Sequence, residues 1–317
     1  MRNTETQGRS ADKYGQAQPG AMPDHPLISI IIPYFNCSAI VACLESLYRQ
    51  TYGNIEIIVV NNNSSKKHLA PLHSQRIRVA AESIQSSYAA RNRGIQCARG
   101  DYFAFIDADC TADKDWLKNL WHTATMENAE MVLGNVIKRI STKGRSYEYV
   151  DRDIYHNHRR LFSQGSGTTA NLLVFKGVVD RVSGFSPQHF SGGDTRFIHD
   201  VVGLGVTYAY AESAVVFHEC RKTLFSLMKK GFRTGVAAGN DDASGFAGFK
   251  HKMKYVRWRC LALMNPFRRN IIRQARSRSI PYAFSYFMHF AAHGIGRCFG
   301  ITNLSRTGVC RTLMRYT

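Results

Sequence analysis

The sequence predicts an α/β fold, in which a mostly parallel sheet is covered by helices on both faces and followed by a basic helical extension. Three observations lead to this expectation. Short apolar runs alternate with segments of helical periodicity through the first two thirds of the chain. These runs are apolar at consecutive positions, which is typical of strands buried on both faces. From Arg221 onward the chain becomes strongly basic, which sets that part apart from the sheet-forming region.

The expected strands are apolar runs that end at polar or turn-forming residues. The first closes at Pro33, the second stops at the polar stretch 61–65, and the fourth ends at Asp107. The strands are expected over residues 27–32, 55–60, 77–79, 102–106, 131–136, 168–175, 206–210 and 214–217.

The expected helices lie between these strands and after them. In residues 39–50, apolar side chains recur at i, i+3, i+4 and i+7 from Ile40. Gly100 is expected at the C-terminal cap of the second helix, Asp113 at the N-cap of the third, and Gly184 at the end of a later one. The helices are expected over residues 39–50, 86–99, 113–128, within 138–164, over 176–183, from Asp194, and over 224–239.

Three segments are expected: a flexible polar tail (1–25), an α/β domain (26–239) and a basic, partly apolar helical extension (240–317). The tail lacks the apolar core of a signal peptide. None of the eight cysteines forms a C-x-x-C pair, which favours free thiols in a reducing compartment. The α/β domain is therefore expected in the cytoplasm.

The positive charge is concentrated at the C-terminal end. The chain carries a net charge of +19, and from Arg221 to Thr317 nineteen Lys and Arg face only two acids, Asp241 and Asp242, which leaves +17 there. Such an excess indicates an anionic partner: lipid headgroups, nucleic acid or a pyrophosphate-bearing substrate. Residues 281–296 are apolar but shorter than the ~20 residues that a membrane-spanning helix needs. They are expected to lie at a membrane surface or against the domain.

Polar residues follow three of the expected strands. Residues 33–36, 61–63 and 107–109 come directly after the first, second and fourth strands. Ligands of parallel sheets bind beyond the carboxyl ends of the strands. All three polar segments are therefore expected to face one crevice.

The segment Asp107-Ala108-Asp109 is a D-x-D that directly follows a buried strand, unlike the same spacing at 113–115 and 151–153. A carboxylate at such a strand end is costly unless it lies in a cleft or is neutralised. Mg²⁺ or Mn²⁺ bound there would bridge a diphosphate and offset the charge of a departing nucleotide. The alternative is that both acids merely cap the next helix.

Six motifs in order resemble those of family-2 glycosyltransferases with the GT-A fold. They lie at residues 27–36, 57–64, 90–94, 98–109, 191–194 and 215–218, so the resemblance covers roughly residues 27–239. It implies a Rossmann-type GT-A domain that moves a sugar from a nucleotide-diphosphate donor to a hydroxyl, with a divalent cation and with inversion. The fit of the basic tail to a membrane surface favours a lipid-linked or cell-surface glycan acceptor and a peripheral place on the inner face of the plasma membrane. Each Lys or Arg near an anionic leaflet contributes about 1 kcal/mol, and segments 229–233 and 250–259 hold several.

The resemblance implies roles on the donor side. Asp109 would bind the metal, and Asp107 the metal or the ribose. The remaining nucleotide-binding residues are expected to be Pro33, Tyr34, Asn36, Asn61, Asn62 and Arg91. Asn61 and Asn62 stand where the family has acids, and Asn62 aligns with the residue that binds the base, so the identity of the base stays open. Arg91 would approach the diphosphate, unless it is a solvated helix residue.

On the acceptor side, the resemblance implies that Asp194 removes the proton of the attacking hydroxyl. Its alternative is an N-cap of the next helix. Gly192 and Gly193 would leave room for the acceptor, and Arg196 replaces an acid of the family and would bind an anionic acceptor or keep Asp194 ionised.

Three further residues are expected near the same site. Trp116 and His189 are candidates for lining the acceptor side. His218 follows a strand and would either complete the metal shell or make a structural hydrogen bond to the backbone.

Other classes of protein fit less well. No glycine-rich loop follows the first strand, which argues against a pyrophosphorylase and a dinucleotide oxidoreductase. Nucleic-acid binding is disfavoured because the cations are not interleaved with a stacking platform. A non-catalytic protein with this fold, binding sugar or lipid, stays open because of Asn61, Asn62 and Arg196.

Overall fold

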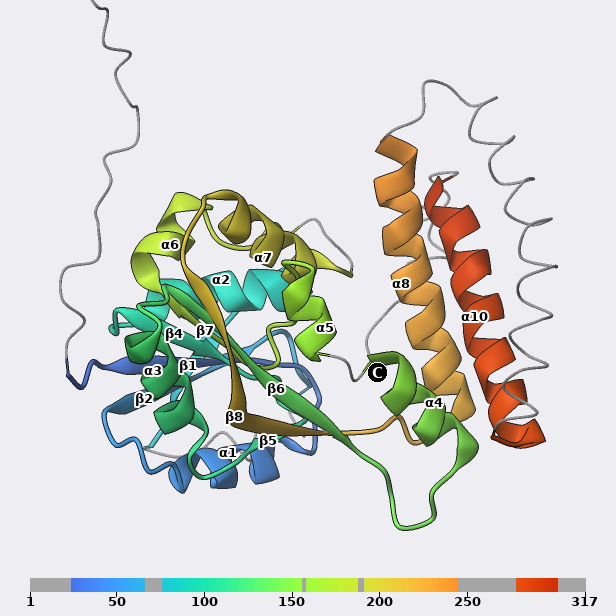
Figure 1. The fold of residues 1–317 in the computed structure, drawn as a ribbon, viewed down its shortest axis with the longest axis horizontal. Coiled ribbons are helices and arrows are strands. Elements are labelled where there is room, and N and C mark those ends of the chain that lie inside the picture. Colours follow the sequence, from blue (N-terminus) through green and yellow to red (C-terminus); the bar gives the residue numbers. More distant parts are fainter. Residues whose placement is uncertain (1–23, 66–75, 156–157, 188–190, 245–277, 302–317) are drawn as a thin grey trace, which may run out of the picture.

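A computed structural model describes residues 24–65, 76–155, 158–187, 191–244 and 278–301 (Figure 1). In these residues one sheet of eight strands has the order β3-β2-β1-β4-β7-β6-β8-β5. The strands are β1 (Ile28–Tyr34), β2 (Ile55–Asn61), β3 (Arg78–Ala81), β4 (Tyr102–Phe105), β5 (Cys110–Ala112), β6 (Met131–Arg139), β7 (Leu172–Phe175) and β8 (Tyr208–Glu219). His189 and the basic residues 250–259 lie outside the described residues.

The helices are α1 (Ile40–Tyr48), α2 (Ser87–Cys97), α3 (Trp116–Met126), α4 (Ser146–Tyr155), α5 (His158–Ser163), α6 (Lys176–Arg181), α7 (Gly193–Gly203), α8 (Leu224–Ser244) and α10 (Ile280–Ile301). The sheet runs through the middle of the α/β part, whereas α8 and α10 stand side by side beyond it (Figure 1).

The sheet is mixed, with its parallel strands on the side that was expected to form the crevice. Strands β3, β2, β1 and β4 are parallel neighbours, and β6 pairs in parallel with β8. Strand β7 is antiparallel to both β4 and β6, and β5 is antiparallel to β8. The predicted fold class is confirmed. The two expected strands at 206–210 and 214–217 are one strand, β8, because an irregularity opposite Gly134 and Asn135 absorbs the residues between them.

Two hydrophobic layers enclose the sheet, as consecutive apolar residues predict. Ile28, Ile30 and Ile32 of β1 pack with residues of α1 and α3 on one face. Ile31 points to the other face, where α2, α6 and α7 supply the covering side chains. This packing holds the carboxyl ends of β1, β2 and β4 together at one edge.

Two expected helix caps are wrong. Helix α2 ends at Cys97 with Ala98 as its C-cap. Gly100 instead lies against β1, where a Cβ would come 2.4 Å from the carbonyl oxygen of Leu27. Helix α3 begins at Trp116 with Asp115 at the N-cap position, because the chain leaves the short strand β5 at Ala112 and turns over residues 113–115.

Helices α8 and α10 pack through glycines at unusually short range. A Cβ at Gly235 would lie 2.0 Å from the carbonyl oxygen of His293, and one at Gly296 would lie 2.1 Å from that of Phe232. Helix α8 runs past residue 239, the expected end of this helix, and Asp242 near its end pairs with Arg297 at 2.6 Å. The expected segment 281–296 thus belongs to a helix that packs against α8 and α4. Among the described helices, none combines the length and the apolar character that a membrane crossing requires.

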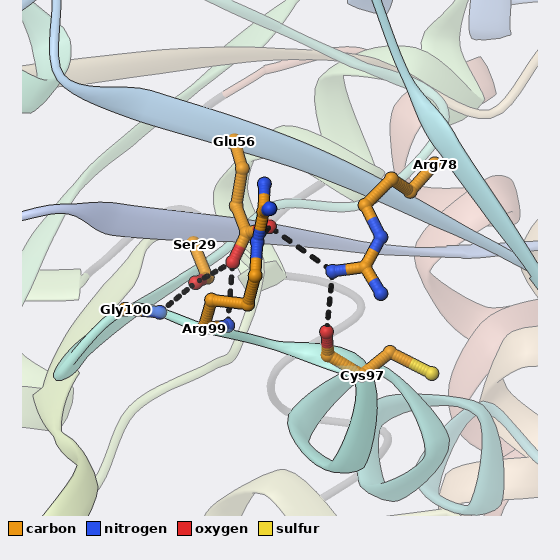
Figure 2. Close-up of polar contacts among 6 residues, drawn as sticks. All are labelled: Ser29, Glu56, Arg78, Cys97, Arg99 and Gly100. Carbon is orange, nitrogen blue, oxygen red and sulfur yellow. Dashed lines mark hydrogen bonds and ion pairs between the residues drawn. The ribbon is translucent and has the colours of Figure 1, made fainter.

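At the opposite end of the strands from the crevice, a buried carboxylate ties β1, β2 and the loop before β4 together (Figure 2). Glu56 accepts hydrogen bonds from the Ser29 hydroxyl at 2.7 Å and from the Arg99 backbone N–H at 2.6 Å. The guanidinium groups of Arg99 and Arg78 lie 3.0 and 3.2 Å from its other oxygen. Burial alone would raise the pKa of Glu56, but these hydrogen bonds outweigh it and the pKa is lowered.

We expect Glu56→Gln to lower the free energy of unfolding at pH 7 by about 1–3 kcal/mol, because hydrogen bonds to a buried charge are lost. A carboxylate whose folded pKa is depressed stabilises above its unfolded pKa of about 4.3, and this stability is lost as pH falls through the folded pKa. Urea unfolding followed by circular dichroism should therefore show the difference from wild type shrinking between pH 7 and pH 3. Glu212→Gln, in an exposed pair with Arg159, is the control and should change little. Equal stability of Glu56→Gln and wild type at pH 7 would contradict this role.

Candidate active site

A cavity of about 470 Å³ lies beyond the carboxyl ends of β1, β2 and β4. The chain following each of these three strands contributes to its wall, so the predicted single crevice is confirmed. The predicted site residues that line it are Pro33, Tyr34, Asn36, Asn62, Arg91, Asp107, Asp109 and His218.

Arg91 is a buried residue of α2, only 4% exposed, and not a solvated helix residue. Its Nη2 donates to Oδ1 of Asp107 at 2.6 Å. Its guanidinium carbon lies 5.8 Å and 5.9 Å from the ring centres of Tyr88 and Phe185. The arginine therefore orients Asp107 at the floor of the cavity and lines that cavity itself.

Asp109 and His218 face each other across the β5–β8 pairing. Oδ2 of Asp109 lies 3.6 Å from Nε2 of His218, and His218 Nδ1 lies 2.8 Å from the carbonyl oxygen of Glu219. A carbonyl accepts, so Nδ1 carries the proton and Nε2 offers a lone pair toward Asp109. The two alternatives for His218, a backbone hydrogen bond and a metal-facing nitrogen, are thus compatible.

The electrostatics keep Asp109 ionised. Burial would raise the pKa of Asp109, but His218 in its protonated form, together with Lys138 and Arg221, outweighs it and the pKa is lowered. The pKa of His218 is lowered chiefly by burial, with Asp109 acting in the opposite direction. A carboxylate beside a neutral imidazole is a suitable ligand pair for a divalent cation.

Ligand atoms of Asp109, Cys110 and His218 lie within 4.8 Å of one another. Burial raises the pKa of Cys110 well above its usual value, so the thiol stays protonated and is a poor ligand. Asp107, expected as a further ligand, lies outside this group and pairs with Arg91. Asp109 and His218 are therefore the described residues whose arrangement best fits a metal.

A second cavity, of about 440 Å³, is lined by Asp194. Asp107, His218, Arg221 and Lys230 line both cavities, so the two are halves of one cleft. Asp194 lies in the first turn of α7, where the helix dipole favours a negative charge. Gly192, with φ of +80°, occupies the N-cap position, so the alternative of Asp194 as N-cap is wrong.

The glycines before Asp194 have a structural role. The N–H of Gly193 donates to the Tyr88 hydroxyl at 2.9 Å, and a Cβ at Gly193 would lie 2.8 Å from the ring of Tyr88. The space beside Gly193 is thus filled by Tyr88 instead of being left for an acceptor. Of the two glycines, Gly192 is the one with free space beside it, because no atom of the described residues beyond its chain neighbours lies within 4 Å of the position of a Cβ.

Two residues expected on the acceptor side lie elsewhere. Trp116 is fully buried in the core, and its indole N–H donates to Asn171 at 2.8 Å. Arg196 is exposed and pairs with Asp200 one turn along α7 at 3.0 Å. The structure thus does not bring Arg196 into contact with Asp194, since an i, i+4 partner is available.

The two asparagines after β2 differ in role. Asn61 accepts the N–H of Ser64 at 2.9 Å and supports its own loop, outside the wall of the cavity. Asn62 lines the cavity and uses both side-chain N–H groups on the carbonyls of Glu82 and Ile84. Its Oδ1 is the atom left to meet a base.

Cations of the C-terminal part line the cleft and were not expected there. Arg221, Lys230 and Arg233 border the first cavity. Lys138, which belongs to β6 of the sheet, borders the second. The spacing of Lys230 and Arg233, three residues apart on a helix, puts them on one face. That spacing was the available signal, because the charge excess by itself fits lipid headgroups and a pyrophosphate-bearing substrate equally well.

Three features define this protein as a GT-A-type glycosyltransferase: the mixed sheet, the D-x-D after β4, and His218 on β8 facing Asp109, the second acid of that D-x-D. The chain belongs to glycosyl transferase family 2, whose model matches residues 29–191.

Relatives and a solved structure agree with this assignment. Glycosyltransferase AglE of Haloferax volcanii is 31% identical over 220 residues, which are 66% of this chain and 72% of AglE. Glycosyltransferase GlyG of Streptococcus pneumoniae is 30% identical over 131 residues, 39% of this chain and 44% of GlyG, so the chain matches less than half of that relative. The mannosyltransferase PcManGT from Pyrobaculum calidifontis, solved with GDP-Man and Mn²⁺, has the same fold, with a TM-score of 0.54 at 16% identity over 94% of this chain and 82% of PcManGT.

Proposed function

We propose that this glycosyltransferase moves a sugar from a nucleoside-diphosphate donor to an acceptor hydroxyl, with inversion and with the help of Mn²⁺ or Mg²⁺. One observation carries the proposal: Asp107 and His218 border both the cavity at the strand ends and the cavity that holds Asp194. A donor in the first cavity and an acceptor in the second would meet at this border.

In this proposal the nucleotide occupies the first cavity, which we name the donor cavity. Asn62 would meet the base through Oδ1, and the chain around Pro33, Tyr34 and Asn36 would border the nucleoside. Asp109 and His218 would hold the cation, which offsets the charge of the departing diphosphate when it is bound. The binding of GDP-Man and Mn²⁺ by PcManGT, which has the same fold, supports this assignment.

Asp194 is the proposed base in the second cavity, which we name the acceptor cavity. Its carboxylate would take the proton of the acceptor hydroxyl as the oxygen attacks the anomeric carbon, while the bond from that carbon to the diphosphate breaks. Arg91 would keep Asp107 oriented at the border between donor and acceptor.

The calorimetric titration of UDP, GDP and dTDP, with and without Mn²⁺, tests the donor assignment. We expect one nucleotide to bind in a metal-dependent manner. A folded protein that binds none of them under any metal condition would contradict the proposal. Metal-dependent binding without transfer to any acceptor would favour a non-catalytic protein of this fold.

We further propose that residues 26–239 carry the transferase activity. Residues 240–317 would bind an anionic membrane surface on its cytoplasmic side. A glycan or lipid-linked acceptor would lie at that surface. Helix α8 crosses the boundary between these two segments of the chain. The support is an exposed apolar stripe along α10, formed by Ile280, Phe284, Phe287 and Ile295. It adjoins a strongly basic sequence, and apolar side chains with nearby cations are typical of helices that lie on anionic membranes. Nucleic acid is not part of this proposal.

Replacing Phe284 and Phe287 with serine should weaken binding to phosphatidylglycerol vesicles at least about tenfold, because two aromatic side chains that would insert into the lipid interface are lost. Co-sedimentation with the vesicles measures this. Met126→Ser, which removes a 72% exposed apolar residue on α3, is the matched control and should bind as wild type does. Equal binding by all three proteins would remove α10 as the docking surface.

A further inference from the structure

Three cations reach the cleft from outside the sheet. Arg221 follows β8, and Lys230 and Arg233 project from α8. All three line the donor cavity, and Arg221 and Lys230 also line the acceptor cavity. The C-terminal part therefore closes the cleft with positive charge at the border where the two cavities meet.

Among the described residues, none of these three cations forms an ion pair with a carboxylate. The buried acid Asp151, next to the backbone of Arg221, is already engaged: it pairs with Lys138 at 3.3 Å and accepts the backbone N–H of Arg221 at 3.2 Å. Nε of Arg233 is buried without a hydrogen-bond partner in the described part of the chain. Lys230 lies over the ring of Tyr155, with Nζ 5.0 Å from its centre.

Clustering these cations is electrostatically costly. Burial lowers the pKa of Lys230 to about 7, and Arg221, Arg233 and Lys138 add to this effect, whereas Asp194 acts against it. Charges that are partly withdrawn from water are normally paired, and a buried donor such as Nε of Arg233 costs free energy without an acceptor. An anion at this position would offset the mutual repulsion of the cations and supply acceptors for their N–H groups.

We propose that Arg221, Lys230 and Arg233 form a phosphate-binding site at the border of the two cavities, separate from the Asp109–His218 pair. The assignment rests on the proposed function and specifies its substrate class: the site takes phosphate oxygens, either of a phosphorylated acceptor or of the donor's diphosphate. Two guanidinium groups and an ammonium group match phosphate oxygens in both charge and hydrogen-bond donors. The acceptor cavity would then receive a hydroxyl-bearing molecule that carries a phosphate.

The experiment uses the full chain and two probes. The Kd of farnesyl phosphate is measured with the metal and the preferred nucleoside diphosphate present, with farnesol as the uncharged comparison, and the Kd of the nucleotide is measured separately with Mn²⁺. The variants are Lys230→Met and Arg233→Met. Lys229→Met is the matched control because the neighbouring residue on α8 lines neither cavity. Lys230→Arg tests rescue by a retained charge, and thermal unfolding verifies that each variant is folded.

We expect both methionine variants to raise the Kd of one of the two probes about tenfold or more, because a charged partner in the cleft is lost. Lys230→Arg should recover most of that affinity. Weaker binding of farnesyl phosphate alone assigns the site to the acceptor, and weaker binding of the nucleotide assigns it to the donor. Unchanged affinity for both probes in folded variants would overturn the phosphate site. Failure of the proposed function is distinguishable, because wild type itself would then bind no nucleotide.

Discussion

Replacing Asp194 with asparagine is expected to lower the turnover number about 10²–10⁴-fold while leaving the Kd of the nucleotide within about twofold. Asparagine has the size of aspartate but cannot accept the proton of the acceptor hydroxyl. Asp194 lines the acceptor cavity and not the donor cavity, so donor binding should be spared. The release of nucleoside diphosphate from the preferred sugar donor, with a membrane lipid extract as the source of acceptor, measures the turnover.

Asp200→Asn provides the control for this experiment. Asp200 lies on the same helix, α7, and pairs with the exposed Arg196. Its replacement changes the same charge without touching the cleft, and turnover should stay within about twofold of wild type. If Asp194→Asn and Asp200→Asn were equally active, another group would have to be the base.

Asp109→Asn is expected to remove the metal-dependent part of nucleotide affinity, a loss of about 10²-fold or more in the presence of Mn²⁺. The amide lacks the negative charge that attracts the cation, while His218 stays in place on β8. In the presence of EDTA, wild type and variant should bind the nucleotide with the same affinity. Isothermal titration calorimetry at matched ionic strength measures both.

The second D-x-D of the chain supplies a control for Asp109. Asp113 lies just before α3, and its carboxylate accepts the backbone N–H of Asp115 at 3.0 Å, outside the walls of both cavities. Asp113→Asn should leave metal-dependent binding unchanged. Metal-dependent binding that survives in Asp109→Asn would exclude Asp109 as a ligand of the cation.

The choice among the three D-x-D segments could be made from the sequence, because their local contexts differ. Asp107 and Asp109 follow a strand whose residues are all buried. Asp113 precedes α3, and Asp151 belongs to α4, where it is buried against Lys138. The apolar residues next to a D-x-D differ between the end of a buried strand and the interior of a helix. The sequence around each D-x-D is therefore enough to tell the two contexts apart.

Two site roles that depend on distant partners were predicted wrongly. Trp116 was a candidate for the acceptor side, but it is buried and its indole hydrogen-bonds to Asn171, far away along the chain. Gly193 was expected to leave space that Tyr88 of α2 in fact fills. Neither partner is visible in the residues next to Trp116 or Gly193.

The sequence alone determined where strands β1, β2 and β4 lie along the chain and which polar residues follow each of them. It thereby determined the crevice with Asp107 and Asp109. The reason is that apolar runs define strands locally, and parallel strands present their carboxyl ends at one edge. The tertiary structure decided which way the basic helix α8 faces. Its packing through Gly235 against α10 turns Lys230 and Arg233 into the cleft. Charge counted along a chain is the same whether a side chain points to solvent or to a cavity, so only the contact between distant helices could distinguish the two.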